Sequence, residues 1–399
     1  MALLKTWRWF GHGDKVRLSD LKQMGVQGVV TSLYDIPAGE IWPVERIQSL
    51  KNEINAHGME WSVVESLPVS EEIKLNTPQG RQHLENYKVS LKNLSSCGIY
   101  IICYNFMPVL DWARTDLQFI DDNGCESMLF EYVVFAAFDM YILKRANAEK
   151  DYPEKIIKQA YAHYKMMSEE DKRELAHNII VVTQKFINSG VGDVENYKEI
   201  FLQFLKRYHH VSKEDLRNNL MIFLNDVIPV AEEYGARLCI HPDDPPFPLL
   251  GLPRIAGTEE DFDWIFSRNT SLANGLTYCT GSLSVREDND LEKIASKFAD
   301  RIHFIHLRNI KKIDDKSFYE SPHLDGVVNM PAVVKIFLQE QLRRRKEGRK
   351  DDQLPFRPDH GLKMLDDFSR QANPGYPLIG RLKGLAEIDG IQAAMKDNL

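Results

Sequence analysis

The sequence predicts an α/β fold of the (β/α)8-barrel type, the TIM barrel, with a helical insertion. Short apolar runs rich in β-branched residues alternate with helical patterns through most of the chain, which is typical of a parallel sheet built from βαβ units. About eight strands are expected, and eight strands each followed by a helix close into a barrel. The nucleotide-binding patterns GxGxxG and GxxxxGK[ST] are absent, which disfavours an open doubly wound sheet.

Glycines punctuate the predicted barrel units. Gly25, Gly58 and Gly98 each stand where a helix should end, because glycine readily takes the left-handed backbone conformation of that position. The run EYVVF is included among the strands because it is apolar and β-branched. The predicted strands cover residues 27–33, 60–65, 100–105, 131–135, 237–241, 275–279, 303–307 and 354–359.

Residues 143–210 interrupt this alternation. They carry long, charged helical patterns without a strand signal between them, so we expect a helical insertion. No internal repeat or low-complexity segment divides the chain, and 399 residues lie within the size range of an elaborated barrel. We therefore expect residues 1–399 to form a single barrel domain that carries this insertion.

The composition is that of a globular protein, with 43% hydrophobic and 27% charged residues. Lys and Arg total 50 against 58 Asp and Glu, and the net charge of -8 disfavours binding to a nucleic acid backbone. One dense basic run, 343–350, ends a predicted helix and is expected to be a solvated face. Nucleic acid is therefore not an expected partner.

No run approaches the roughly 18 apolar residues of a membrane span, and the first residues lack the apolar core of a signal peptide. We expect a cytoplasmic protein without a membrane partner, assembled as a homo-oligomer. The five cysteines are an odd number without CxxC spacing, so they are expected to be free thiols. A role for one of them in binding metal stays open at this point.

Metal-ligand residue types stand at the ends of four successive predicted strands. His241 ends RLCIH, Cys279 ends GLTYC, His306 lies near the end of IHFIHL, and Asp359 ends LPFRPD. In a barrel the carboxyl ends of all strands meet at one mouth, where active sites lie, so these side chains should converge. A buried His or Cys alone would more simply be a core residue, but four together favour a shared metal site.

The donor types indicate the class of metal. Two imidazoles, a thiolate and a carboxylate suit a transition metal such as Mn, Fe, Co or Zn better than Mg or Ca, which prefer oxygen ligands. His360 directly follows Asp359, and an imidazole titrates near neutral pH, so His360 is a candidate base beside the metal.

The segments around these residues resemble the mannonate dehydratase family. The similar segments are CIHPDDPP (239–246), TYCTGSLS (277–284), FIHLRN (304–309), RPDHG (357–361), WRWFG (7–11), YNFMPVLDWARTDL (104–117) and NPGYPLIGRLKGLAEIDG (373–390). The resemblance covers nearly the whole chain and implies a barrel of the xylose-isomerase-like class. It also implies a divalent metal ion, Mn or Fe(II), bound by His241, Cys279, His306 and Asp359.

The activity that the resemblance implies is the conversion of D-mannonate to 2-keto-3-deoxy-D-gluconate and water, a step in hexuronate breakdown. It implies His360 and Tyr376 as the proton-transfer pair, with the order of action open. Among the arginines near the motifs, Arg8, Arg308 and Arg357 are candidates for binding the sugar acid, because a guanidinium matches planar anions.

Two of the substrate-binding candidates have plainer alternatives. Arg8, within WRWFG, has the alternative role of stacking on its aromatic neighbours. His323 and Asp325, in the loop SPHLDG, are hydrophilic loop residues, of which His323 is the candidate for substrate binding.

Three rival functions remain at this stage. A metal-dependent sugar isomerase or epimerase on the same barrel also moves a proton beside a hydroxyl group, although the soft thiolate of Cys279 disfavours it. A metal-dependent nuclease needs a basic track that this acidic chain lacks. A sugar-acid binding protein without catalysis would need no metal.

Overall fold

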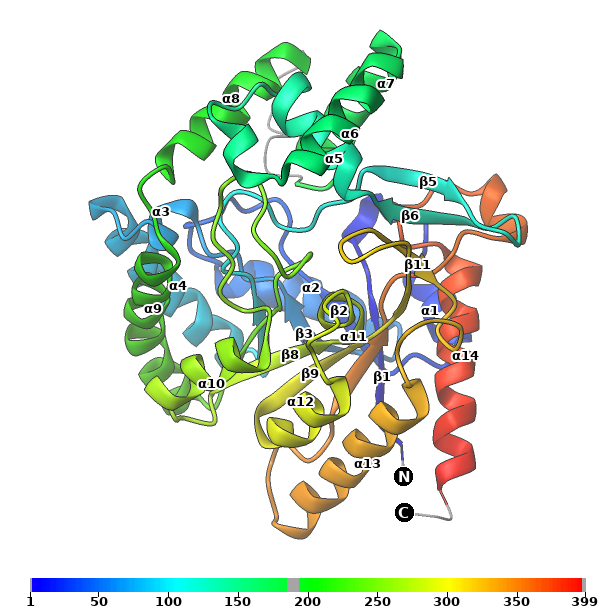
Figure 1. Cartoon of the computed structure of the whole chain (residues 1–399). Helices are drawn as coiled ribbons and strands as arrows, with labels where there is room; N and C mark the ends of the chain where they lie inside the picture. The colour runs from blue at the N-terminus through cyan, green and yellow to red at the C-terminus, as the bar shows by residue number, and fades with distance from the viewer. Residues whose placement is uncertain (1, 185–193, 397–399) are drawn as a thin grey trace.

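The computed structural model describes residues 2–184 and 194–396. Within these residues, parallel strands close into an eight-stranded barrel with the order β1-β12-β9-β8-β7-β4-β3-β2 (Figure 1). The strands are β1 (Leu4–Arg8), β2 (Gly28–Thr31), β3 (Glu60–Glu65), β4 (Ile101–Tyr104), β7 (Arg237–Ile240), β8 (Asn274–Cys279), β9 (Ile302–Leu307) and β12 (Pro355–Pro358). The predicted (β/α)8-barrel class is confirmed.

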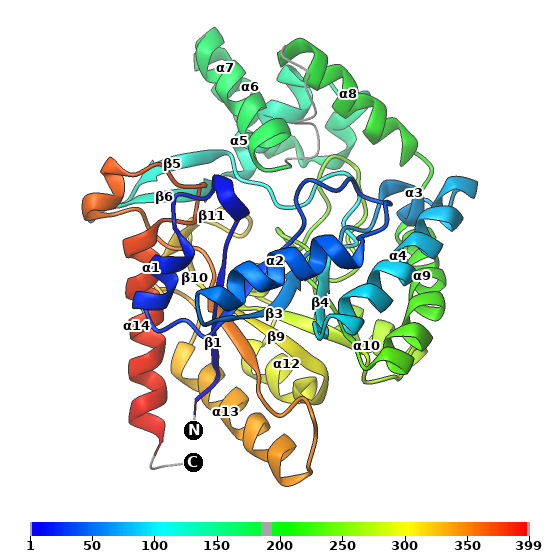
Figure 2. The same cartoon turned by 180° about the vertical axis from the view of Figure 1, so that it is seen from behind.

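Helices surround the barrel, as the views from both sides show (Figures 1 and 2). Gly25, Gly58 and Gly98 follow three helix ends with φ of 71°, 70° and 76°, so the predicted glycine positions are confirmed. The surrounding helices include α1 (Leu18–Gln23), α2 (Val44–Ala56), α3 (Glu71–Lys74), α4 (Pro78–Ser96), α9 (Lys213–Tyr234), α10 (Glu259–Arg268), α11 (Thr280–Ser284), α12 (Leu291–Lys297), α13 (Met330–Lys346) and α14 (Leu378–Met395). Apolar side chains between strands and helices form the main core.

One predicted strand is wrong, and one barrel strand is missing from the prediction. The run 131–135 lies largely in helix α5 (Tyr132–Ala137), and the barrel instead includes β1, formed by LKTWR. The helix is apolar on almost every side because it is buried, and a short buried helix and a buried strand cannot be told apart by periodicity. Strand β1 has only five residues, and its sequence LKTWR does not alternate polar and apolar residues, so it gives no clear strand signal.

A second sheet, which the sequence did not predict, stands beside the barrel mouth. Its four strands have the order β10-β11-β6-β5 and pair antiparallel. Strands β5 and β6 project to one side of the barrel in both views (Figures 1 and 2). The strands are β5 (Asp116–Ile120), β6 (Glu126–Phe130), β10 (Asn309–Lys312) and β11 (Phe318–Ser321). Two distant parts of the chain therefore meet in this sheet.

Helices of the middle of the chain gather over one end of the barrel, opposite the two termini (Figure 1). They are α5, α6 (Glu154–Met166), α7 (Glu169–His177), a π-helix (Asn178–Val182) and α8 (Val194–Arg207). Their buried faces form a second core that includes Phe135, Leu175, Ile179 and Phe201. The single-domain organisation and the insertion boundaries 143–210 stay predictions.

The basic run 343–350 is not the uniformly solvated face that the sequence predicts. Arg344 has no exposed surface, because its guanidinium donates to Glu340 and to the carbonyls of Ala299 and Ile302. The five cysteines are free, as predicted. Among the described residues, the helices are too short or too polar for one of them to span a membrane.

Candidate active site

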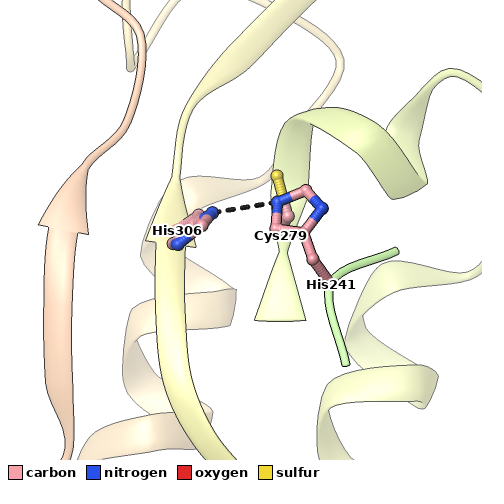
Figure 3. A group of neighbouring side chains, drawn as sticks. All are labelled: His241, Cys279 and His306. Carbon is pink, nitrogen blue, oxygen red and sulfur yellow. Dashed lines mark hydrogen bonds between the residues drawn. The ribbon is translucent and has the colours of Figure 1, made fainter. Parts of the chain in front are cut away.

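The barrel brings the predicted ligands together at its mouth. His241 follows β7, Cys279 is the last residue of β8, His306 lies near the end of β9, and Asp359 follows β12. Figure 3 shows His241, Cys279 and His306 converging from three neighbouring strands. One ligand atom from each of these three residues lies within 4.8 Å of the other two.

The two imidazoles are oriented in a way that favours a cation between them. His241 Nε2 lies 3.2 Å from His306 Nδ1. His241 Nδ1 is 2.7 Å from the Pro242 carbonyl oxygen, which can only accept, so the proton of His241 is on Nδ1 and Nε2 is bare. His306 Nε2 lies 3.4 Å from Glu65 Oε2, and its Nδ1 faces both His241 Nε2 and, at 3.4 Å, Arg357 Nη2.

The spacing of these nitrogens also fits a metal site. Two nitrogens that bind one tetrahedral ion at about 2.1 Å lie roughly 3.4 Å apart, close to the 3.2 Å observed. Two lone pairs facing each other repel, and a cation between them removes this repulsion. The donor geometry therefore fits a bound transition metal.

Asp359 adjoins this group of three. Its Oδ2 lies 3.7 Å from Cys279 Sγ and 4.0 Å from His306 Nδ1. Burial alone would raise the pKa of Asp359, but the adjacent Arg357 guanidinium and other positive groups hold that pKa well below its ordinary value. The fourth predicted ligand is therefore an ionised carboxylate at the edge of the cluster.

Glu65, a residue that the sequence reasoning missed, organises two of the predicted arginines. Arg8 Nη1 donates to Glu65 Oε1 over 2.7 Å, and Arg357 donates to both carboxylate oxygens over 2.9 and 3.0 Å. Burial disfavours the charge on Glu65, yet the positive charges of Arg357 and Arg8 keep its pKa well below the ordinary value. Arg8 also lies over the rings of Phe10 and Tyr376, so it makes the expected aromatic contacts as well as an ion pair.

Four buried charged residues form a closed ring beside the metal ligands, which we call the mouth cluster: Arg114, Asp244, Arg308 and Glu320. Arg114 pairs with Asp244 over 3.0 Å and with Glu320 over 2.7 Å. Arg308 pairs with the same two carboxylates, with Glu320 over 2.9 Å. Two cations and two anions balance, and the pKa of Glu320 falls to about 2 because Arg308 and the other positive groups beside it together outweigh the effect of burial.

The mouth cluster leads directly to His360. His360 Nδ1 lies 2.6 Å from Arg308 Nη1 and 3.1 Å from Glu320 Oε1. The His360 and Tyr376 rings meet edge to face with centroids 5.1 Å apart. Burial lowers the pKa of His360 and raises that of Tyr376, so both side chains favour their uncharged forms.

A single cavity opens onto most of these residues. Val182, the last residue of the π-helix, and Thr183 and Gln184 after it also line its wall. The insertion therefore contributes to the site as well as covering it. The predicted residues that line the cavity are Arg8, His241, Arg308, Arg357, Asp359, His360 and Tyr376.

His323 is not among the residues that line this cavity. Its ring is buried against Gly384 of α14, and its carbonyl accepts a hydrogen bond from Asn309. Burial lowers the pKa of His323 to about 4. Asp325 lies at the surface, where it pairs with Lys311. The structure therefore does not bring the SPHLDG loop side chains to the cavity with the other candidates.

Comparison with known protein families shows to which family the chain belongs. The sequence pattern of the family D-mannonate dehydratase (UxuA) matches residues 3–399. The chain belongs to the D-mannonate dehydratase family. It is 47% identical over 395 residues to mannonate dehydratase 1 of Agrobacterium fabrum and also 47% identical to the mannonate dehydratase of Rhizobium meliloti, covering 98% of this chain and 96% of each relative.

A solved structure of the mannonate dehydratase family has the same fold. The crystal structure of mannonate dehydratase from Streptococcus suis serotype 2 is similar with a TM-score of 0.76 and 32% identity, covering 100% of this chain and 95% of that chain. The family resemblance expected from the sequence motifs is confirmed.

In this member of the mannonate dehydratase family, several cavity residues escaped the sequence reasoning. Glu65 and Asn105 stand at or after strand ends, so the rule that found the metal ligands would have found them too. Glu320 and Arg114, which belong to the mouth cluster behind the cavity lining, carry no such signal, because they lie in the second sheet and in the loop before it. Asp111 also lines the cavity from that loop.

Proposed function

We propose that this chain removes water from D-mannonate to give 2-keto-3-deoxy-D-gluconate, with a divalent metal ion bound by His241, Cys279, His306 and Asp359. Membership of the D-mannonate dehydratase family supports the substrate and the reaction. The observation that carries the metal is the pair of imidazole nitrogens that face each other 3.2 Å apart beside a thiol and a carboxylate.

The mixed set of donors favours a transition metal, and the family resemblance implies Mn or Fe(II). Nitrogen, sulfur and oxygen ligands together suit a transition metal and do not suit Ca, which prefers an oxygen-rich shell. When bound, the ion supplies a Lewis acid that stabilises negative charge developing on the carboxylate end of the sugar acid.

The reaction needs one base and one acid from the protein. A base takes the proton from C2, the C2–C3 double bond forms, and the C3 hydroxyl leaves as water after it receives a proton. The resulting enol then moves its proton to C3 and becomes the 2-keto acid. We assign these proton transfers to His360 and Tyr376, which are buried, uncharged and adjacent at the cavity wall.

The surroundings of His360 Nδ1 allow either role for this side chain. A proton on Nδ1 points to Glu320 and leaves Nε2 bare as a base. After Nε2 takes a proton, the imidazolium that forms is the acid, and its Nδ1 proton still points to Glu320. The hydrogen bond to Glu320 thus supports both protonation states that a proton-transfer residue passes through.

Arg8 is the arginine best placed to bind the substrate carboxylate. It lines the cavity, donates to Glu65 through Nη1, and has a buried Nε without an acceptor among the described residues. Arg357 and Arg308 use both of their terminal nitrogens on carboxylates of the protein. The substrate-binding roles of Arg308, Arg357 and His323 therefore stay predictions.

Metal removal tests the proposal. The purified protein is incubated with a chelator, dialysed and assayed with D-mannonate for the 2-keto-3-deoxy acid. We expect turnover to disappear and to return with Mn or Fe(II), whereas Ca should restore little. Cys279→Ser should retain less metal, because a hydroxyl replaces the thiolate.

Two results would contradict the proposal. Undiminished turnover by the metal-free protein would exclude the metal. A product that keeps all its oxygen atoms would indicate an isomerase or epimerase instead of a dehydratase. The location in the cytoplasm and the homo-oligomeric state stay predictions, and size-exclusion chromatography with light scattering would measure the latter.

A further inference from the structure

Asp111 lies in the loop after β4 and lines the same cavity as His241, His360 and Tyr376. Neither the metal site nor the proton-transfer pair uses it. The loop holds its backbone firmly, because the Asp111 amide donates to Gln184 Oε1 over 2.7 Å and Gln184 Nε2 donates to the Trp112 carbonyl over 2.9 Å. Gln184, which follows the π-helix, therefore fixes the backbone from which the Asp111 side chain extends.

Asp111 differs from the other carboxylates of the cavity in its partners. Glu65, Asp244 and Asp359 each form ion pairs with buried arginines. Across residues 2–184 and 194–396, Asp111 has no cationic group within ion-pair distance. Burial raises its pKa, whereas paired Glu65, Asp244 and Asp359 all have lowered pKa values.

The hydrogen bonds of Asp111 leave one carboxylate oxygen for a ligand. Oδ1 accepts a hydrogen bond from Asn105 Nδ2 over 2.9 Å, and no described residue donates to Oδ2. Asn105 lines the cavity too, and its amide oxygen is a further acceptor. Asp111 and Asn105 therefore place hydrogen-bond acceptors on their wall of the cavity, whereas the Arg8 side carries positive charge.

We propose that Asp111, supported by Asn105, binds the hydroxyl-bearing part of the sugar acid and selects against acids that carry a second carboxylate. This inference rests on the proposed function. A hydroxyl group donates to a carboxylate in a strong, charge-assisted hydrogen bond. A second carboxylate at that wall meets an unpaired negative charge in a poorly solvated cavity, where repulsion is large.

The test compares D-mannonate with the six-carbon diacid that has a carboxylate in place of its terminal hydroxymethyl group. Both acids are measured as ligands of the metal-loaded enzyme, D-mannonate by kcat/KM and the diacid by its inhibition constant. For Asp111→Asn we expect kcat/KM for D-mannonate to fall by about tenfold or more, since the charged acceptor is lost. The inhibition constant of the diacid should decrease at least about tenfold, because the repulsion between the two carboxylates is lost.

Two further variants keep the result interpretable. Asp116→Asn removes a carboxylate from β5, in the same part of the chain but outside the lining of the cavity, and should change neither measurement. Asp111→Ser removes the charge but keeps a small acceptor, and it replaces Asp111→Asn if that variant does not fold. An unchanged preference between the two acids in a folded Asp111 variant would overturn the proposal.

This outcome is separable from the failure of the proposed function. If the wild-type enzyme does not convert D-mannonate, the dehydratase assignment fails directly. The competition between the monoacid and the diacid is then measured by calorimetry with the metal-loaded protein. Equal affinities of wild type and Asp111→Asn for the diacid would still overturn the subsite.

Discussion

Buried arginine–carboxylate clusters occur at both ends of the barrel, and their partners differ. The mouth cluster adjoins the side chains proposed to act on the substrate, because Arg308 lies 2.6 Å from His360 and 3.3 Å from Asp359. At the opposite end, Arg344 of α13 pairs with Glu340 over 2.7 Å. Its Nη2 donates to the backbone carbonyls of Ala299 and Ile302 at 2.7 and 2.9 Å. Its Nη1 donates to the Asp351 carbonyl at 3.2 Å and lies 3.5 Å from the Asp351 carboxylate.

The comparison shows how one kind of interaction serves two purposes. Arg344 ties helix α13 to the start of β9, so its hydrogen bonds hold the barrel closed. Arg308 and Glu320 hold side chains that face the cavity, so their hydrogen bonds set the position of reacting groups. The mouth of such a barrel carries activity and the opposite end carries stability, and the acceptors of each arginine reflect this division.

The largest effect on kcat is expected for substitutions of His360 and Tyr376, beside the mouth cluster. His360→Asn or Tyr376→Phe should lower kcat by about 10² to 10⁴, the range for a positioned acid or base, with metal content and KM nearly unchanged. Steady-state kinetics and metal analysis check this. In deuterated solvent, a variant without only the acid should still exchange the C2 proton, and one without the base should not. A loss of less than about threefold in both variants would exclude the pair.

A substitution at the opposite end should separate stability from activity. Arg344→Met leaves Glu340 without one of its buried partners, and we expect the free energy of unfolding to fall by about 3 to 5 kcal/mol. The kcat at a temperature where the variant is folded should stay within about twofold of wild type. Denaturant titration and kinetics measure the two quantities. A large loss of kcat in the folded variant would contradict the division of activity and stability between the two ends of the barrel.

A substitution of Glu320 tests whether the mouth cluster orients the proposed reacting groups. Glu320→Gln keeps the size and an acceptor for His360 but leaves Arg114 and Arg308 with Asp244 as their one shared carboxylate in the mouth cluster. We expect kcat to fall about 10- to 100-fold with little change in KM, as for residues that orient a reacting group. Asp139→Asn is the matched control, because Asp139 is an equally buried partner of Arg145 outside the lining of the cavity. An equal loss of kcat in the control would indicate a general effect of buried charge.

The smallest effect concerns pH at the stability end. His303, at the start of β9, has a pKa lowered to about 3 by burial and by the charge of Arg344, against about 6.5 when unfolded. The unfolded chain therefore binds a proton that the folded chain does not, and stability falls as pH decreases from about 6.5 toward 3. His303→Gln should reduce this slope in unfolding titrations at several pH values. An unchanged slope would assign the effect to other groups.

The sequence by itself determined the barrel and the convergence of the candidate metal ligands. A parallel strand delivers its last residues to a common mouth, so the grouping of His241, Cys279, His306 and Asp359 was predictable from their positions at strand ends. His360 was singled out by its place directly after Asp359, and the family motifs added Tyr376. The prediction of a strand at 131–135 was wrong because a short buried helix and a buried strand share one apolar pattern.

Only the tertiary structure decided which charges are compensated. Arg114 and Glu320 are 206 positions apart, and Arg308 and Asp244 are 64 positions apart, yet they form one ring. The same holds for Asp111, whose backbone is held by Gln184, 73 positions away. Such pairings depend on where the second sheet and the insertion meet the barrel, and the local pattern of a sequence does not contain that information.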